Sequence, residues 1–496
     1  MSRRTRILAP AVCLLLLLGI LPGCNKLPEP EPGEITPPVI FVDGYYCSLD
    51  RASATYSALL ATTTDFSAMP VEFRTDAGRI LLGERELAKK GELLDLRSPL
   101  TIRVVMGRTY EEFTLQVRNT GLPVVRITTP RAVTSKTNWL AGATLRIELP
   151  DGTVDYEGPM SIRGRGNSTW NYPKKPYALK LDEKARILSM PSQKRWVLLA
   201  NWKDRTLLRN DAAFWLSSHT GLPYTVRGQF VELVLNGSHM GNYYLCEQIR
   251  IAKKRVPVED GGLLLELDTY FDEPNRFLSQ DFQLPWMVKE PDEDELTPEQ
   301  FEDFKQWIRD LETLLKDEER VKAHEYTQYL DVDTAIDFMI VQELTCNQDF
   351  YNNWPTNMPP GPHSVYLYKQ PGGKLYTGPV WDFDYHTFVP NRTKQWAGAN
   401  RTMYYPALLK DPDFRARMVE RWDAQKDQLK GLTEYIDEMV QQLSDSEGVN
   451  HTLWPIPTTQ NENGDEQISF PEAVGRMKES FLAKWSWMDS HIRQLK

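Results

Sequence analysis

Cysteine is scarce in this chain of 496 residues, which contains only five. None of them belongs to a CxxC pair, and they are scattered along the sequence. This spacing predicts neither a disulfide framework nor a zinc site. The five are Cys13, Cys24, Cys47, Cys246 and Cys346.

Basic residues are also fewer than acidic ones. The chain has 58 lysines and arginines and 68 aspartates and glutamates, so its formal net charge is -10. This balance argues against a long basic groove, so we expect no nucleic-acid partner. Three familiar catalytic signatures are absent as well: the GxxxxGK(S/T) phosphate loop, HExxH and GxSxG. Classical zinc hydrolase and serine hydrolase functions are therefore disfavoured.

Long apolar runs are missing except at the N-terminus, where three arginines precede an apolar run from Ile7 to about Leu21. Pro22-Gly23-Cys24 follows, and the pattern predicts a secretory signal peptide over residues 1–23. A cysteine at this point resembles a bacterial lipobox, which implies cleavage before Cys24 and a lipid on its sulfur. The run is shorter than the roughly 20 residues of a membrane span, so a spanning anchor is the disfavoured alternative. We expect an exported lipoprotein, membrane-anchored on the periplasmic or cell-surface side.

Composition divides the rest of the chain into three parts. Residues 24–38 are rich in proline and glutamate, which is typical of an extended tether. Residues 39–121 contain short alternating strands, such as 39–42, 100–105 and 112–117, and predict a small all-β, immunoglobulin-like domain. We interpret that domain as a spacer or interaction module. Residues 122–496 mix strands and helices and predict an α+β domain.

Several elements of the larger domain are predicted by local signals. Asn236-Gly237 joins two apolar runs as a tight hairpin turn. Thr297 and Gln300 form a capping box around Pro298, so a helix begins there and presents an apolar face as far as Leu315. Further amphipathic helices are predicted over residues 333–344, 414–443 and 471–494.

Two neighbouring segments have the composition of a phosphate site. Arg163 to Trp170 combines two glycines, two arginines and a small polar run, which suits backbone and cationic contacts to phosphate, although an ordinary glycine turn has the same composition. Tyr177, Leu179 and Leu181 alternate with polar or small residues and predict a strand that places Lys180 on the opposite face. A strand lysine after a glycine-rich loop is where kinases hold nucleotide phosphates, and a solvated lysine is the alternative.

Two acidic segments follow later in the chain. Asp349, with Asn352 and Asn353 close behind, has the spacing of a hydroxyl-proton acceptor and a metal ligand, although a polar helix end has the same residues. Asp382 and Asp384 alternate within Val380-Trp381-Asp382-Phe383-Asp384, so on a strand they would share a face. Two such carboxylates in apolar surroundings predict an Mg²⁺ or Mn²⁺ site.

Together and in this order, these segments resemble the CotH (spore-coat protein H) kinase-like family. The resemblance extends from about Leu122 to the C-terminus. It is carried by five blocks: 161–170 with 176–180, 196–204 with 208–210, 241–247, 365–369 and 381–384.

The resemblance implies an atypical protein-kinase-like domain of two lobes that uses ATP with Mg²⁺ or Mn²⁺ and phosphorylates serine or threonine of a protein. Matched by position, Asp349 is the candidate base, Asp382, Asp384 and Asn353 are metal ligands, and Glu247 lies near the adenine. The remaining nucleotide contacts implied are Arg163, Arg165, Asn167, Ser168 and Lys180.

The sequence departs from the family between the candidate base and the strand at 365–369, where Trp354–His363 intervene. Two alternatives to an exported kinase therefore stay open. One is an inactive kinase-shaped surface module for adhesion, envelope assembly or glycan binding. The other is a metal-dependent phosphoesterase that uses Asp382 and Asp384.

Overall fold

The computed structural model describes residues 35–76, 78–292, 294–351, 361–398, 400–456, 463–465 and 467–495. The predicted signal peptide, Cys24 and Asn353 lie outside these residues. Within them, no helix is long and apolar enough to cross a membrane. The chain forms two compact units, and the second contains residues 57–68, 95–97 and everything from Val117 onward. We had expected the division between residues 121 and 122.

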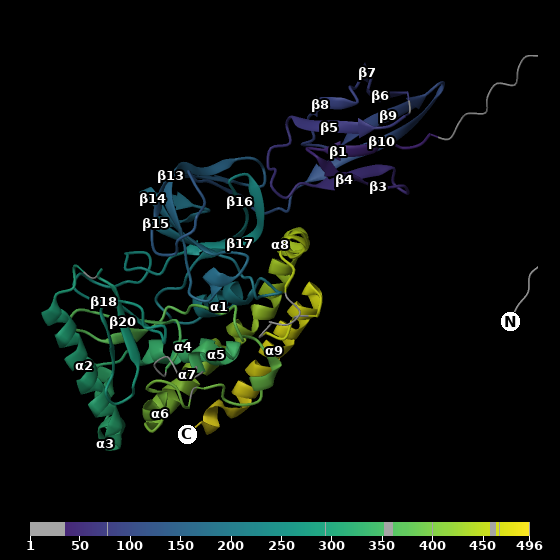
Figure 1. Ribbon diagram of the computed structural model, residues 1–496. Coiled ribbons are helices and arrows are strands. Elements are labelled where there is room, and N and C mark those ends of the chain that lie inside the picture. Colours follow the sequence, from purple (N-terminus) through teal and green to yellow (C-terminus); the bar gives the residue numbers. More distant parts are fainter. Residues whose placement is uncertain are drawn as a thin grey trace, which may run out of the picture. The chain divides into compact units, whose positions relative to one another are not determined.

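The first unit consists of two β-sheets with no helix among its described residues (Figure 1). The predicted strands at 39–42, 100–105 and 112–117 are confirmed as β1, β9 and β10. The sheet orders are β2-β1-β5-β8 and β3-β4-β10-β9-β6-β7. The strands are β1 (Val39–Val42), β2 (Tyr45–Tyr46), β3 (Ser48–Asp50), β4 (Thr55–Leu59), β5 (Met69–Arg74), β6 (Arg79–Leu82), β7 (Arg85–Glu86), β8 (Lys90–Leu94), β9 (Leu100–Met106) and β10 (Thr109–Arg118).

The second unit begins with a closed barrel of seven strands, in the order β11-β12-β13-β14-β15-β17-β16. Its interior is filled by alternating apolar side chains, including Leu179, Trp196 and Leu245. The predicted hairpin is confirmed, because β16 and β17 are antiparallel and join at Asn236-Gly237. The strands are β11 (Val124–Thr128), β12 (Leu140–Glu148), β13 (Val154–Gly164), β14 (Tyr177–Ile187), β15 (Met190–Leu199), β16 (Gly228–Leu235) and β17 (Ser238–Glu247).

A five-stranded sheet and most of the helices form the rest of this unit around a second apolar core. The sheet order is β19-β20-β18-β21-β22, with β18 (Leu263–Leu267), β19 (Arg276–Leu278), β20 (Pro285–Glu290), β21 (Val365–Lys369) and β22 (Leu375–Thr377). The helices are α1 (Arg209–Ser218), α2 (Pro298–Lys316), α3 (Glu318–Lys322), α4 (Val332–Thr345), α5 (Gln348–Tyr351), α6 (Tyr405–Leu408), α7 (Pro412–Lys430), α8 (Leu432–Leu453) and α9 (Phe470–His491).

The predicted helices are confirmed with one correction. The capping box at Thr297 begins α2 as expected, and α4 covers the predicted helix at 333–344. The helix expected over 414–443 is instead two helices, because α7 ends at Lys430 and α8 begins at Leu432 with Gly431 between them. Amphipathic periodicity continues through both and therefore does not reveal the break.

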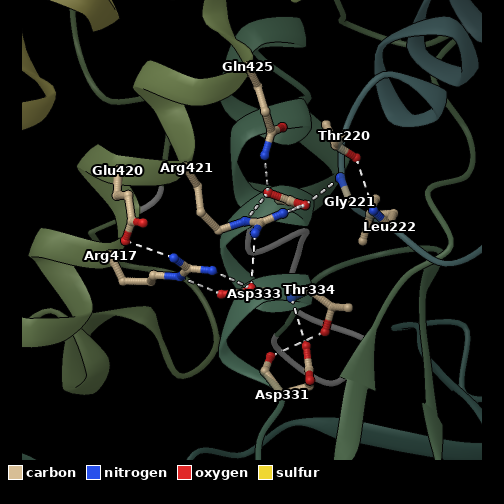
Figure 2. A network of polar contacts seen from close by, with 11 residues as sticks. Thr220, Gly221, Leu222, Asp331, Asp333, Thr334, Arg417, Glu420, Arg421 and Gln425 are labelled. Atoms are coloured by element: carbon tan, nitrogen blue, oxygen red, sulfur yellow. Dashed lines mark hydrogen bonds and ion pairs between the residues drawn. The ribbon is translucent and has the colours of Figure 1, made fainter.

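A charged network joins α4 to α7 (Figure 2). Arg421 donates from Nε to Asp337 at 2.7 Å and from Nη1 to Asp333 at 2.9 Å. Asp337 also accepts from the backbone nitrogen of Gly221 at 2.7 Å, so the network holds the loop after α1 as well. This anchors α1, which begins with residues that support the site described next.

Candidate functional site

A cleft of about 1060 Å³ lies within the second unit. Its lining comes from β13–β15 of the barrel, from β18, β20 and β21 of the five-stranded sheet, and from residues 381–385. Segments that were predicted from the sequence to bind phosphate and segments that were predicted to bind a metal both contribute to it. Of the predicted site residues, the cleft is lined by Arg163, Arg165, Asn167, Ser168, Asp349, Asp382 and Asp384.

Asp382 and Asp384 lie on a loop and not on the strand that their alternation suggested. Asp382 has a left-handed backbone with φ of +68°, which breaks the strand geometry. The carboxyl groups nevertheless meet and share a hydrogen bond. The pKa of Asp384 is raised because protein atoms exclude water from it and because Asp382 repels its charge, and loss of water also raises the pKa of Asp382. A cation between them would relieve this repulsion.

Three residues that the sequence did not single out surround Asp382. Ser364 donates from Oγ to Asp382 Oδ2 at 3.1 Å, and its backbone nitrogen donates to Asp268 Oδ2 at 3.0 Å. His363 Nδ1 lies 3.6 Å from the other oxygen of Asp268. The pairing of Leu267 with Val365 in β18 and β21 produces this cluster, because it places Asp268 beside Ser364. No local pattern in the sequence marks these positions.

The loop that carries Asp382 and Asp384 (residues 381–387, the acidic loop) is held by residues 201–210, which lie before and at the start of α1. Asn210 Oδ1 accepts from the backbone nitrogen of Phe383 at 2.8 Å. Asn210 Nδ2 in turn donates to Asn201 at 3.1 Å, and Asn201 donates to the carbonyl of Leu207 at 3.0 Å. The chain of asparagines therefore fixes the peptide between the two acidic side chains.

A buried arginine supports the same loop from its far end. Arg209 is 1% exposed, and its Nε donates to the carbonyl of Thr387 at 3.0 Å. Its Nη1 is ion-paired with Asp204 and, at 2.8 Å, with Asp465. Asn463 adds a hydrogen bond of 2.9 Å to the carbonyl of Asp384. Both ends of the acidic loop are thus anchored to buried polar groups.

The glycine-rich segment also lines the cleft and contacts the loop that carries Asp382 and Asp384. The guanidinium of Arg165 stacks 5.1 Å from the Trp381 ring, and its charge lowers the pKa of Asp382. Lys136 donates to Asn167 Oδ1 at 2.8 Å and to the Gly166 carbonyl at 3.3 Å. Gly164 is required sterically, because an added Cβ would lie 2.2 Å from the Trp170 ring. The segment is therefore a packed loop that places the Arg165 guanidinium near the Asp382 carboxylate.

Two predicted nucleotide residues are not among those that line the cleft. Lys180 is exposed on β14, on the face opposite Leu179 as expected, and it pairs across the strands with Arg195. Glu247 is fully buried, and its carboxylate is ion-paired with Arg227 at 2.8 Å and with Arg255 at 3.4 Å. Its side chain therefore ties β17 to neighbouring segments.

Other cations of the cleft were missed by the sequence analysis. Lys289 of β20 lies 3.0 Å from Glu266 and also pairs with Glu273. Burial raises the pKa of Glu266 to about 7, and Lys289 opposes that rise. The available signal is a charged residue that directly follows a run of apolar residues in a strand, as in Leu-Leu-Leu-Glu266 and Trp-Met-Val-Lys289. Such residues are costly unless they are paired.

The described side chains supply only part of the ligand shell that an ion such as Mg²⁺ needs. Among the described residues, no group of three or more His, Cys, Asp or Glu side chains is arranged to hold a metal. Mg²⁺, however, binds through one or two carboxylates and completes its shell with water and substrate phosphates. Asp382 and Asp384 supply two such carboxylates, and their mutual repulsion favours a cation.

Comparison with known proteins identifies the family. A solved structure described as a candidate glycoside hydrolase from Bacteroides thetaiotaomicron is 14% identical and covers 54% of this chain and 86% of its own, but its TM-score of 0.14 carries no argument. The comparison with curated proteins gave no match. The family model described as CotH kinase protein matches residues 162–481, which is more than half of the chain and includes every lining segment from β13 to the acidic loop. The chain therefore belongs to the CotH kinase family.

Proposed function

We propose that this protein is an exported atypical protein kinase that transfers the γ-phosphate of ATP to serine or threonine of a surface or envelope protein. One observation carries the proposal: the glycine-rich segment with Arg165 and the carboxylates of Asp382 and Asp384 line the same cleft. Phosphoryl transfer depends mainly on positioning and on stabilising charge, so a phosphate-binding loop beside a metal-binding pair would supply its main requirements.

The proposal assigns two lobes to the second unit. The barrel would be the nucleotide-covering lobe, and the five-stranded sheet with its helices would be the other. The chain leaves the barrel at the end of β17 and enters the sheet at β18, and Gln248, Ile249 and Arg250 of this connection line the cleft. This is the position at which Glu247 was expected to lie near the adenine.

Each wall of the cleft has a separate task in this proposal. Arg165 would bind the phosphates from the barrel side, with Asn167 and Ser168 beside it. Asp382 and Asp384 would hold Mg²⁺ or Mn²⁺, which when bound screens the charge of the phosphates. Asp349 would accept the proton of the acceptor hydroxyl, with Asn353 as a further metal ligand. Lys180 would act only at the rim, because it does not line the cleft.

The proposal of export rests on the N-terminal sequence. The basic start, the apolar run and Cys24 favour a lipid-anchored protein outside the cytoplasm. An acceptor in the envelope or on the cell surface is therefore proposed.

The test uses the chain without its signal peptide, incubated with γ-labelled ATP and Mg²⁺ or Mn²⁺. We expect wild type to transfer label to protein and Asp382→Ala to lose at least about 100-fold of this activity. Asp182→Ala, on the exposed face of β14 and away from the cleft, is the matched control. Asp349→Ala tests the base separately.

Two results would change the assignment. Release of inorganic phosphate without labelled protein would favour a phosphoesterase. Absence of both nucleotide binding and label under either metal would leave a kinase-shaped surface module, with glycan binding as its first test.

A further inference from the structure

Trp139 stands between two arginines on the barrel wall of the cleft. The guanidinium carbon of Arg163 lies 4.7 Å from the centre of the indole, and that of Arg195 lies 4.6 Å from it. All three residues line the cleft and are half-buried. Stacking holds a guanidinium by its face and leaves its N–H groups at the edge available for hydrogen bonds.

Neither guanidinium is neutralised. Within the described parts of the chain, no carboxylate lies within ion-pair distance of Arg163 or Arg195. Arg163 donates to the Thr137 carbonyl at 3.1 Å, but its buried Nε has no partner. Burial and the positive charge of Arg250 lower the pKa of Arg195 to about 10, and burial and Arg165 lower the pKa of Arg163. Asp292 and Glu290 act on Arg195, and Glu273 acts on Arg163, but each opposes the shift only in part, so the pKa of both arginines stays below its ordinary value.

Two neighbouring cations, Arg250 and Lys289, differ in this respect. Arg250 lies 2.5 Å from Glu290 and 3.9 Å from Asp292. Lys289 is paired with Glu266 and Glu273. Arg250 and Lys289 therefore have carboxylate partners, whereas Arg163 and Arg195, which stack on Trp139, have none within ion-pair distance among the described residues.

The strand register places Arg163 and Arg195 farther than Arg165 from the part of the cleft that contains Asp382 and Asp384. Arg163 pairs with Ala178, and one step of two residues farther along β14 Lys180 pairs with Arg195. Arg165, which stacks on Trp381, lies two residues in the other direction. Each step of two residues is about 7 Å, so the row runs away from the Asp382 and Asp384 pair. Phosphates held at Asp382 and Asp384 would therefore be bound by Arg165.

We propose that Arg163, Trp139 and Arg195 form an anion subsite that binds an acidic segment of the protein acceptor next to its target hydroxyl. This inference rests on the proposed kinase function and deepens it by naming the class of acceptor. It also assigns Arg163 to the acceptor, whereas the family resemblance assigned it to the nucleotide.

The dimensions of the subsite favour a peptide with alternate acidic residues. Because both guanidinium carbons lie within 5 Å of one ring centre, they are no more than about 9 Å apart. Side chains two positions apart on one face of an extended peptide are separated by about 7 Å. Glutamate or aspartate at such positions would meet one guanidinium each, with two parallel N–H···O bonds per pair.

The experiment measures binding without catalysis. A fluorescent extended peptide with one serine between glutamates at alternate positions is titrated with the protein, beside a peptide of the same sequence with glutamine at those positions. We expect the acidic peptide to bind more tightly at low salt, and Arg195→Gln and Arg163→Gln each to weaken it by about tenfold or more. Trp139→Leu, which keeps both charges but removes the stack, is expected to weaken it as well.

Controls separate this subsite from the nucleotide site and from misfolding. Arg186→Gln changes an exposed arginine of β14 outside the cleft and should leave peptide affinity unchanged. ATP affinity, titrated separately with Mg²⁺, should stay within about twofold in Arg195→Gln. Thermal melting checks that each variant is folded.

Three outcomes would overturn the proposal. Equal affinity for the acidic and glutamine peptides would remove the anion preference. Loss of ATP affinity with unchanged peptide affinity in Arg195→Gln would assign the subsite to the nucleotide. Equal weakening by Arg186→Gln would show only a general charge effect. Failure of the kinase proposal is distinct, because it appears as loss of nucleotide binding or transfer while peptide binding persists.

Discussion

The side-chain oxygen of Asn210 accepts a hydrogen bond from the backbone nitrogen of Phe383 at 2.8 Å. Phe383 stands between Asp382 and Asp384 in the chain, so this bond fixes the backbone that joins them. We expect Asn210→Ala to weaken metal binding and to lower phosphoryl transfer by about 10- to 100-fold, because small displacements of catalytic groups cost that much. The cost in folding free energy should be about 1–3 kcal/mol, since a buried N–H loses its partner.

The matched control for this prediction is Asn236→Ala. Asn236 also donates and accepts through its side chain, in bonds to Thr129 at the turn between β16 and β17. It is not among the residues that line the cleft, so its loss should affect stability alone. Mn²⁺ titration and a kinase assay on both variants make the comparison. Equal loss of metal affinity in the two would contradict a positioning role for Asn210.

Asp384→Asn should separate stability from function. Loss of water and repulsion by Asp382 raise the pKa of Asp384 to about 8, so ionising Asp384 beside Asp382 destabilises the metal-free protein. The variant removes one charge and should melt a few degrees higher than wild type in EDTA at pH 8, as expected for about 1 kcal/mol. Added Mg²⁺ should stabilise wild type and not the variant. A variant that melts lower than wild type in EDTA would show that the repulsion is already relieved.

Asp382 and Asp384 show how much of the site could be predicted from the sequence. The spacing of Asp382 and Asp384 predicted that their carboxylates would meet, and they do. The reason was wrong, because the segment is a loop with Asp382 in the left-handed region. In contrast, hairpin and helix signals such as Asn236-Gly237 and the capping box at Thr297 act within a few residues, and they placed β16, β17 and α2 correctly.

The rest of the site depends on contacts that no local pattern encodes. Asp268 and Ser364 are brought together only by the register of β18 and β21, and Asn210 meets Phe383 across more than 170 residues of chain. Lys180 shows the converse. Its strand and its face were predicted correctly, and Ala178 on the same face lines the cleft, but how far the cleft extends along the strand depends on the tertiary fold, and Lys180 lies outside it.

Lys174 should give the protein a pH-dependent stability. Burial lowers its pKa to about 7, and its Nζ lies 2.8 Å from the carbonyl oxygen of Ala200 and from Oδ1 of Asn450 and also contacts the carbonyl oxygen of Asn242. Between pH 7 and about 10.4 the unfolded chain binds more protons at this lysine than the folded chain. The free energy of unfolding should therefore rise with pH over this window and lose this contribution as pH falls toward 7.

Urea unfolding of wild type and Lys174→Met from pH 7 to 9.5 checks this expectation. The variant should be less stable by about 1–3 kcal/mol at the upper end, because buried oxygens lose their donor. The difference should shrink as the pH falls. Lys175→Met is the control, since Lys175 is half-buried and donates to the single carbonyl of Trp170. A constant difference across the range would mean that Lys174 titrates at its ordinary pKa.

The network between α4 and α7 allows a comparison of two arginines on the same helix (Figure 2). Arg421 is bonded to Asp337, whose side chain is 1% exposed, whereas Arg417 is bonded to Asp333, whose side chain is 40% exposed. Arg421→Met would leave the Asp337 charge buried with only the donors of Gly221 and Gln425, at 2.7 and 3.0 Å. We expect a loss of about 3–5 kcal/mol in the free energy of unfolding.

Arg417→Met should cost less than about 1 kcal/mol, although Arg417 makes as many hydrogen bonds to carboxylates as its neighbour does, because water can solvate Asp333 and Glu420 once the arginine is gone. Asp337→Asn combined with Arg421→Met should recover part of the larger loss, since it removes the unpaired charge. Chemical unfolding of the three variants measures these differences. Similar losses for Arg421→Met and Arg417→Met would show that the number of bonds, and not the burial of the carboxylate, sets the stability of this interface.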